Sequence, residues 1–234
     1  MARQLAGRLV LELARSGPAR ARGVGRLRTL SAAVAMGDID VDLSLEALID
    51  ARATRSAPRL DDLVVREWSK PDTALCLLID KSGSMGGDRL AAAGLAAAAA
   101  AWRAPADHSV LAFASDVIVI KAQDRPRSAD SVVDDVFGLR GHGPTDLHFA
   151  LLQARVQLER SRAKRRITVL LSDCIPTIGE DPAVAARQLD ELHIIAPADE
   201  PEAAEEFGRA LGATVGLLKG PSDIPRLFGV LLDR

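Results

Sequence analysis

The chain has 234 residues, 48% of them hydrophobic, which fits one α/β domain with additional material and excludes a disordered protein. Aromatic residues make up only 3% and the net charge is −2, so a base-stacking nucleic-acid surface, a carbohydrate cleft and an anionic membrane surface are not indicated. No apolar run is long enough to predict a transmembrane helix, and the two cysteines give neither a zinc motif nor a disulfide framework.

Residues 1–70 are predicted to form a basic helical N-terminal extension and linker. Helices are expected over 4–17 and 44–53, and linkers over 17–28 and 55–62. Residues 1–36 hold seven arginines and a single acid, Glu12. This pattern fits a transit peptide or a partner-binding arm as well as the solvated face of a small helical appendage. No secretory signal is evident, and we expect a cytoplasmic protein.

Residues 71–234 alternate between apolar runs and helical patterns, which predicts a second, larger domain. The expected strands cover 73–80, 109–115, 117–121, 166–173, 192–197 and 213–218, and the expected helices cover 88–103, 128–139, 146–161, 182–191, 202–212 and 222–233. The short spacing between 109–115 and 117–121 predicts an antiparallel hairpin. The fold class is therefore predicted as a doubly wound, Rossmann-like α/β sheet, mostly parallel, with one antiparallel edge strand and helices on both faces.

Oxygen-bearing side chains follow two of these expected strands. The run "LIDKSGSMGGDR" ends a strand on Asp80 and carries Ser82 and Ser84 into the next loop, and a later strand ends on Asp173. Between them, "RGHGPTD" presents Thr145 just before a helix. Ligand sites in open α/β sheets lie beyond the carboxyl ends of the strands, so neighbouring strands would bring these five side chains together. Carboxylates and hydroxyls without imidazole or thiolate favour a hard divalent cation, Mg²⁺ or else Mn²⁺ or Ca²⁺.

The set resembles the metal-ion-dependent adhesion site of von Willebrand factor type A (integrin I-like) domains. "DKSGSM" matches the D-x-S-x-S element, and Thr145 and Asp173 match the later threonine and aspartate of that pattern. The resemblance implies a non-catalytic module in which the bound cation presents an open coordination position to an acidic residue of a partner. Four residues are expected at the partner-facing rim: Lys81, Met85, His142 and Asp146. Lys81 departs from the common pattern, and its ammonium is expected to point to solvent.

Residues 38–80 are similar to the stretch that precedes the domain in intracellular CoxE-like and magnesium-chelatase D-type proteins. That resemblance implies a partner of the AAA+ ATPase class, of MoxR or chelatase type, with no nucleic acid and no membrane insertion. The chain carries no G-x-x-x-x-G-K-[ST] motif, so the ATPase itself would be another protein. An alternative is a scaffold subunit of a metal-chelatase or cofactor-maturation complex.

A serine hydrolase is the rival interpretation of the same stretch. The order Ser84, Asp173, His193 follows that of α/β-hydrolases, although the first glycine of G-x-S-x-G is replaced by Ser82. A third reading takes Ser82 and Thr145 as helix caps and the aspartates as ordinary loop acids. His142 and His148, which flank Thr145, are expected to face solvent or to hold the loop.

Overall fold

The computed structural model describes residues 26–32, 38–69, 73–82, 87–141 and 143–232. They fall into two compact units, one within Arg22–Pro71 and the other within Asp72–Arg234. Among these described residues, no helix combines the length and the hydropathy needed to cross a membrane.

The smaller unit is a three-stranded antiparallel sheet with one helix. Its elements are β1 (Arg26–Ser31), β2 (Asp38–Ile39), α2 (Leu45–Thr54), the 3-10 turn η1 (Leu60–Asp62) and β3 (Val64–Ser69), with strand order β1-β3-β2. The prediction of α2 is confirmed. The expected helix over 4–17 lies outside the described residues. The expectation of helices and linkers without strands is wrong for the described part, because β1 pairs with β3 from more than thirty positions away and local patterns do not reveal such pairing.

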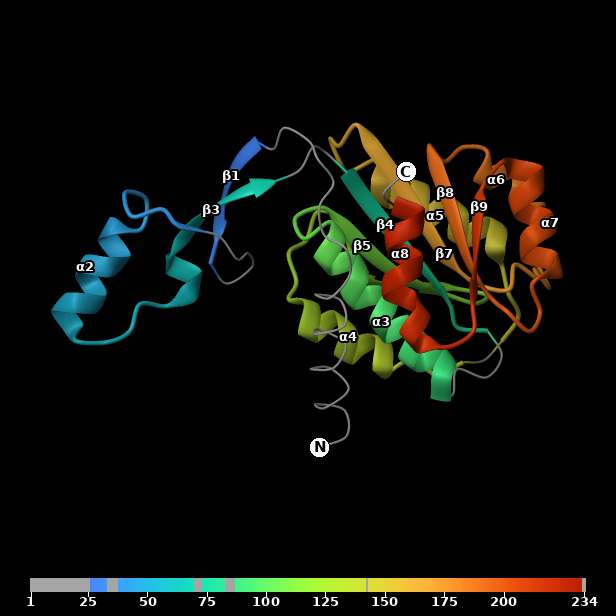
Figure 1. The fold of residues 1–234 in the computed structure, drawn as a ribbon, viewed down its shortest axis with the longest axis horizontal. Coiled ribbons are helices and arrows are strands. Elements are labelled where there is room, and N and C mark those ends of the chain that lie inside the picture. The colour runs from blue at the N-terminus through green and yellow to red at the C-terminus, as the bar shows by residue number, and fades with distance from the viewer. Residues whose placement is uncertain (1–25, 33–37, 70–72, 83–86, 142, 233–234) are drawn as a thin grey trace. The chain divides into compact units, whose positions relative to one another are not determined.

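The larger unit is built on a six-stranded sheet (Figure 1). Its strands are β4 (Thr73–Asp80), β5 (His108–Phe113), β6 (Val117–Lys121), β7 (Arg165–Leu171), β8 (Glu191–Pro197) and β9 (Thr214–Leu218). Their order is β6-β5-β4-β7-β8-β9, and only β6 is antiparallel to its neighbour. The predicted doubly wound sheet with one antiparallel edge strand is confirmed, and strand order reverses at β4, which lies between β5 and β7.

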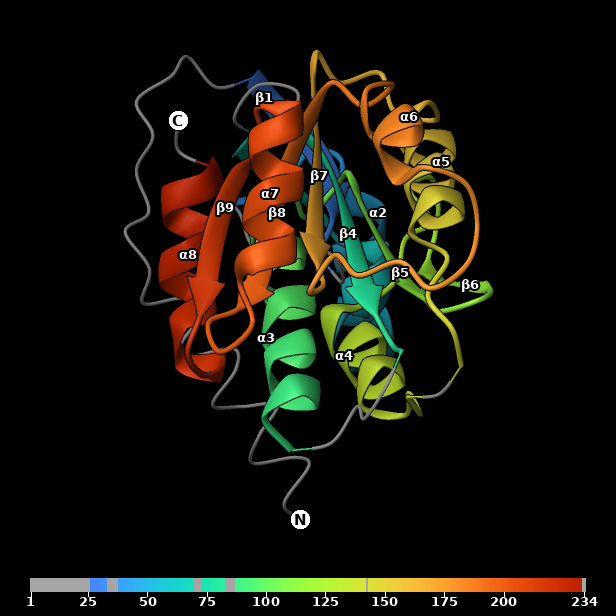
Figure 2. The ribbon, with the colours of Figure 1, turned by 90° about the vertical axis from the view of Figure 1, so that its right-hand side faces the viewer.

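Helices cover both faces of this sheet (Figures 1 and 2). One face packs against α3 (Gly87–Arg103), α4 (Ala129–Phe137) and α8 (Ile224–Leu232), which follows the 3-10 turn η2 (Pro221–Asp223). The other face packs against α5 (Leu147–Leu158), α6 (Pro182–Ala186) and α7 (Glu202–Leu211). Strand β4 serves both cores: alternate side chains point to opposite faces, so Leu77 and Ile79 join the first while Cys76 and Leu78 join the second.

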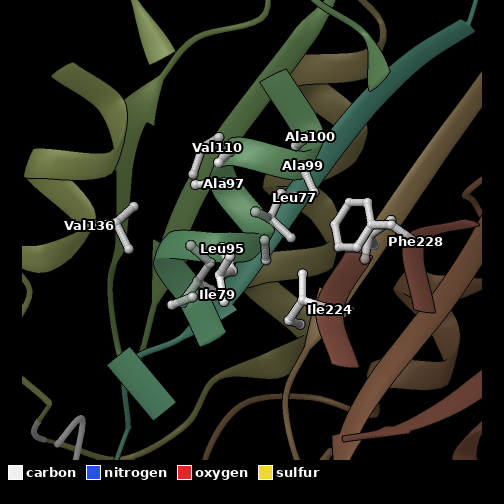
Figure 3. Packing of buried hydrophobic residues seen from close by; sticks show 14 of the residues in the cluster. Leu77, Ile79, Leu95, Ala97, Ala99, Ala100, Val110, Val136, Ile224 and Phe228 are labelled. Carbon is white, nitrogen blue, oxygen red and sulfur yellow. The ribbon is translucent and has the colours of Figure 1, made fainter. Parts of the chain in front are cut away.

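Alanine rather than aromatic residues fills the space between α3 and the sheet (Figure 3). The helix buries Ala93, Ala96 and Ala100 completely, against neighbours that include Leu77 of β4 and Phe228 of α8. Small side chains let the helix approach closely, and alanine also has the highest helix propensity. This close packing fixes the position at which α3 begins, beside the carboxyl ends of the strands.

Candidate metal centre

The two strands that lead to the site's aspartates are neighbours, although β7 ends at Leu171 and not at Asp173 as expected. Strands β4 and β7 run parallel, and the last pair in their register joins Ile79 to Leu171. The next rung therefore places Asp80 level with Ser172, and Asp173 lies one residue farther out. Both carboxylates lie at the carboxyl edge of the sheet, at the point where strand order reverses.

Asp80 is held by hydrogen bonds on both of its oxygens. Its Oδ1 accepts from the backbone N–H of Ser82 at 2.9 Å, and its Oδ2 accepts from the Ser172 hydroxyl at 2.6 Å. Burial nevertheless raises the pKa of Asp80, because desolvation outweighs these bonds and the nearby Asp173 charge adds to it. A buried carboxylate of this kind is stabilised in its charged form by a bound cation.

Asp173 and the residue after it form a tight turn at the end of β7. The Asp173 Oδ1 accepts from the backbone N–H of Ile175 at 3.0 Å. Cys174 adopts the left-handed region at φ 62°, and its N–H donates to the Ser172 hydroxyl at 3.0 Å. Burial raises the pKa of the Cys174 thiol, with the Asp173 and Asp80 charges as smaller causes. Burial therefore disfavours a Cys174 thiolate at this edge.

Thr145 reaches the same edge through the loop before α5. Its N–H donates to the Thr177 hydroxyl at 2.7 Å, and its carbonyl accepts from the N–H groups of Thr177 and Ile178 at 3.0 and 3.2 Å. The following residue, Asp146, donates its N–H to the Ala114 carbonyl at 2.9 Å, just beyond β5. Thr145 is only 3% exposed, and its hydroxyl has no hydrogen-bond partner within the described part of the chain. The hydroxyl is therefore free to serve as a ligand.

Lys81 is the clearest correction to the predicted rim. Its side chain is 4% exposed rather than in solvent, and its Nζ forms an ion pair with Asp116 Oδ1 at 2.9 Å. The turn between β5 and β6 supplies this carboxylate, so the ammonium points toward the hairpin. The expectation of a solvent-facing Lys81 is wrong.

The other rim residues are placed unevenly. Asp146 caps α5, its Oδ1 accepting from the Phe149 N–H at 2.9 Å, and its part in binding a partner stays a prediction. Ser84, Met85 and His142 lie outside the described residues. His148 holds the loop as expected, with its Nδ1 2.9 Å from the Asp181 carbonyl.

The hydrolase alternative fails on the position of its histidine. His193 pairs with Val169 in the middle of β7, four residues before Asp173, which is about 13 Å along a strand. Its side chain is 6% exposed and its Nε2 lies 2.7 Å from Glu191 Oε1. His193 therefore belongs to a polar cluster near the opposite edge of the sheet and cannot complete a triad with Asp173.

The donor set fits a hard divalent cation. Across the described ranges, no group of three or more His, Cys, Asp or Glu side chains is arranged to hold a metal, so a nitrogen- or sulfur-rich site is not formed there. Two carboxylates with hydroxyl oxygens are the ligands that Mg²⁺ and similar ions take. Sequence reasoning missed Ser172 and Thr177, which orient Asp80 and Thr145, because only the strand register and the loop contacts reveal them.

Comparison with known proteins identifies the fold and the family. The family model described as "VWA domain containing CoxE-like protein" matches residues 8–196. No curated protein sequence matches the chain.

Solved structures that resemble the chain are von Willebrand factor type A domains and proteins that contain such folds. A von Willebrand factor type A protein from Catenulispora acidiphila is 19% identical with a TM-score of 0.53, covering 70% of this chain and 43% of that one. The mussel byssus protein PTMP1 with a zinc-occupied MIDAS motif is 13% identical, with a TM-score of 0.52, covering 70% and 48%. The manganese-loaded Plasmodium vivax TRAP protein is 16% identical, with a TM-score of 0.50, covering 69% and 73%. The chain thus spans less than half the length of the first two.

Proposed function

Because the chain belongs to the family of VWA domain containing CoxE-like proteins, a family of protein-interaction and metal-binding modules, we propose that it binds a partner protein through a divalent cation. The cation would be held by Asp80, Ser82, Ser84, Thr145 and Asp173. When bound, it would offer an acidic residue of the partner an open coordination position. The chain itself would be non-catalytic and cytoplasmic.

The observation that carries this proposal is the convergence of Asp80, Asp173 and Thr145 at one edge of the sheet. Asp80 ends β4 and Asp173 follows the neighbouring β7 by two residues. Thr145 is held by Thr177 and Ile178 of the loop after β7, and its neighbour Asp146 bonds to Ala114 just beyond β5. Among the described residues, the desolvated Asp80 carboxyl is hydrogen-bonded by Ser82 and Ser172 and by no cationic side chain, and Lys81 is paired with Asp116. Manganese and zinc in two structural relatives support a divalent ion here, and Mg²⁺ is the ion we propose.

The proposed partner is an AAA+ ATPase of MoxR or chelatase type. The similarity of residues 38–80 to the corresponding stretch of CoxE-like and chelatase D-type proteins supports this choice. A scaffold subunit in a metal-chelatase or cofactor-maturation complex is the second candidate. It is favoured by a group of large apolar side chains of the small unit that are at least half exposed, namely Ile39, Val41, Leu43, Leu45, Ile49 and Leu60.

Thermal unfolding of the wild-type protein tests metal binding, in EDTA and in excess Mg²⁺ or Mn²⁺. A ligand at one hundred times its Kd stabilises the folded state by about 2.7 kcal/mol, which raises the Tm of a domain of this size by about 5–11 °C. Asp80→Ala and Asp173→Ala should lose this rise, whereas Asp190→Ala, at an exposed position far from the site, should keep it. The absence of any rise at millimolar metal in the wild type would refute the proposal.

Pull-down with a purified MoxR- or chelatase-type ATPase tests the partner. We expect capture in Mg²⁺, its loss in EDTA, and its loss with Asp80→Ala. Capture of the ATPase in EDTA by both the wild type and Asp80→Ala would favour the scaffold interpretation instead.

A further inference from the structure

A small cavity opens directly beside the two aspartates of the metal site. Its volume is about 60 Å³, and its polar wall contains Asp80, Ser82, Ser172 and Asp173. Its position means that a partner residue reaching Asp80 and Asp173 would bring its neighbouring residue to the cavity.

The floor of the cavity is apolar and comes from four strands and one helix. Ile79 and Leu171 are the last paired residues of β4 and β7, and Pro197 and Leu218 are the last pair of β8 and β9. Ala92 of α3 also lines the cavity and is 1% exposed. A volume of 60 Å³ corresponds to roughly four to six water positions, which is comparable with an aliphatic side chain such as leucine.

Arg89 stands at the edge of this cavity with its charge uncompensated. The side chain is exposed, on the first turn of α3, and within the described part of the chain its guanidinium has no ion-pair or hydrogen-bond partner. The two negative charges of Asp80 and Asp173 would balance a divalent cation. The charge of Arg89 would then make the opening of the cavity positive when the cation is bound. A positive mouth beside an apolar floor is complementary to a carboxylate that is followed or preceded by an aliphatic residue.

We propose that this cavity selects the partner, by accepting an aliphatic side chain adjacent to the acidic residue that binds the cation, while Arg89 attracts the carboxylate. The occupant is thus a partner segment in which aspartate or glutamate neighbours a leucine-sized residue. This inference rests on the proposed function and specifies the chemistry of the partner. It assigns Arg89 and Leu218 as specificity-determining residues.

Labelled peptides test the proposal on the full-length chain loaded with Mn²⁺. Each peptide carries one aspartate in a glycine-serine background. Leucine, phenylalanine, lysine or glycine is placed either directly before or directly after this aspartate. Fluorescence anisotropy measures the affinity, and EDTA gives the metal-independent background. We expect at least one leucine peptide to bind about tenfold more tightly than its glycine counterpart, the factor for burying most of one aliphatic side chain.

Two variants of Leu218 separate the cavity from the metal site. Leu218→Phe should fill the cavity and remove the preference for leucine, and Leu218→Ala should enlarge it and shift the preference toward phenylalanine. Both variants should keep the metal-dependent rise in Tm, which shows that they are folded and loaded. Ile118→Phe, on the exposed edge strand β6, is the matched control and should change nothing.

Arg89 is tested with the same peptides. Arg89→Ala should weaken all aspartate peptides several-fold, Arg89→Lys should restore part of the affinity, and Arg162→Ala, at an exposed arginine on the α5–β7 loop, should have no effect.

The outcomes distinguish the two proposals. Metal-dependent binding without a leucine preference, or with a preference that Leu218→Phe and Leu218→Ala leave unchanged, would refute the cavity and leave the proposed function intact. If the protein binds Mn²⁺ but binds none of the aspartate peptides, both proposals are refuted.

Discussion

Replacing Gly179 by alanine should damage the loop that holds Thr145. Gly179 has φ +93°, a region that side-chain-bearing residues rarely adopt, and a Cβ there would lie 2.7 Å from Cγ of Asp146. Asp146 would have to move, and its carboxylate is the cap that accepts from the Phe149 N–H of α5. Since the same loop positions Thr145 through Thr177 and Ile178, the displacement should reach the metal site.

The expected cost is the sum of backbone strain and a lost cap. Left-handed backbone costs alanine about 1–2 kcal/mol, and loss of an N-cap costs about 1 kcal/mol. Together they should lower the free energy of unfolding by about 2–3 kcal/mol and the Tm by about 4–12 °C. Urea unfolding followed by circular dichroism measures the first quantity, and the metal-dependent rise in Tm reports the loss of metal affinity.

Two other glycines divide this cost into its parts. Gly143 shares the positive φ, at +91°, but its Cβ would meet only Ser115 Oγ at 3.8 Å, so Gly143→Ala should show strain alone. Gly220 is extended, at φ −169°, with nothing within 4 Å, so Gly220→Ala should be nearly neutral. Asp146→Ala removes the atoms that the new Cβ would meet, so the double variant should lose less stability than the sum of the single variants. Additivity, or equal effects at Gly179 and Gly220, would refute the reasoning.

Three further predictions concern titration, the core and the thiols. The pKa of Asp80 is raised above its ordinary 3.8, so the folded state holds this proton more tightly than the unfolded state. In EDTA, the contribution of Asp80 to the free energy of unfolding should therefore fall as the pH rises from 3.8 toward the raised pKa. Urea unfolding of wild type and Asp80→Asn, measured between pH 4 and 7 at steps of about one pH unit, should differ in how the free energy of unfolding depends on pH. Phe228→Ala should lower the free energy of unfolding by about 3–5 kcal/mol because the ring is 1% exposed, whereas Val230→Ala, at a half-exposed position of the same helix, should change it by less than about 1 kcal/mol in the same urea assay. Burial raises the pKa of Cys76 to about 12 and also raises that of Cys174, so Ellman's reagent at neutral pH should label both thiols only after unfolding, and rapid labelling of the native protein would contradict their burial.

The presence of most strands in the larger unit was predictable because it depends on local patterns. Continuous apolar runs identified β4 and β7, and the general rule for α/β sheets brought Asp80 and Asp173 to one edge, as the structure shows. The hairpin of β5 and β6 was predictable from its short spacing, and it is confirmed. The strands and the hairpin depend on residues that are near one another in sequence, whereas the meeting of the two aspartates was expected only from the general rule.

Contacts between distant segments were not predictable. The antiparallel pairing of β1 with β3 leaves no local signature, since "RLRTLS" alternates poorly and its first residues fit a linker as well as a strand. The ion pair of Lys81 with Asp116 joins residues thirty-five positions apart, and the Ser172 hydroxyl reaches Asp80 only because of the strand register. In each case tertiary geometry decides the partner, and a single sequence does not contain it.

The alanines of α3 restrict how this protein can vary. In most cores a position tolerates several aliphatic residues, but here Ala93, Ala96 and Ala100 are already in full contact, and Gly94 leaves no room for a Cβ beside the Phe137 ring. Each added methyl group would push the helix outward at a cost of about 1–3 kcal/mol. The alanine side chains therefore fix the distance between α3 and the sheet. Saturation mutagenesis of Ala93, Ala96 and Ala100 should find that small residues are tolerated and larger ones are not, whatever their hydrophobicity. The reason is that the distance between α3 and the sheet also sets the position of Arg89 relative to the strand ends.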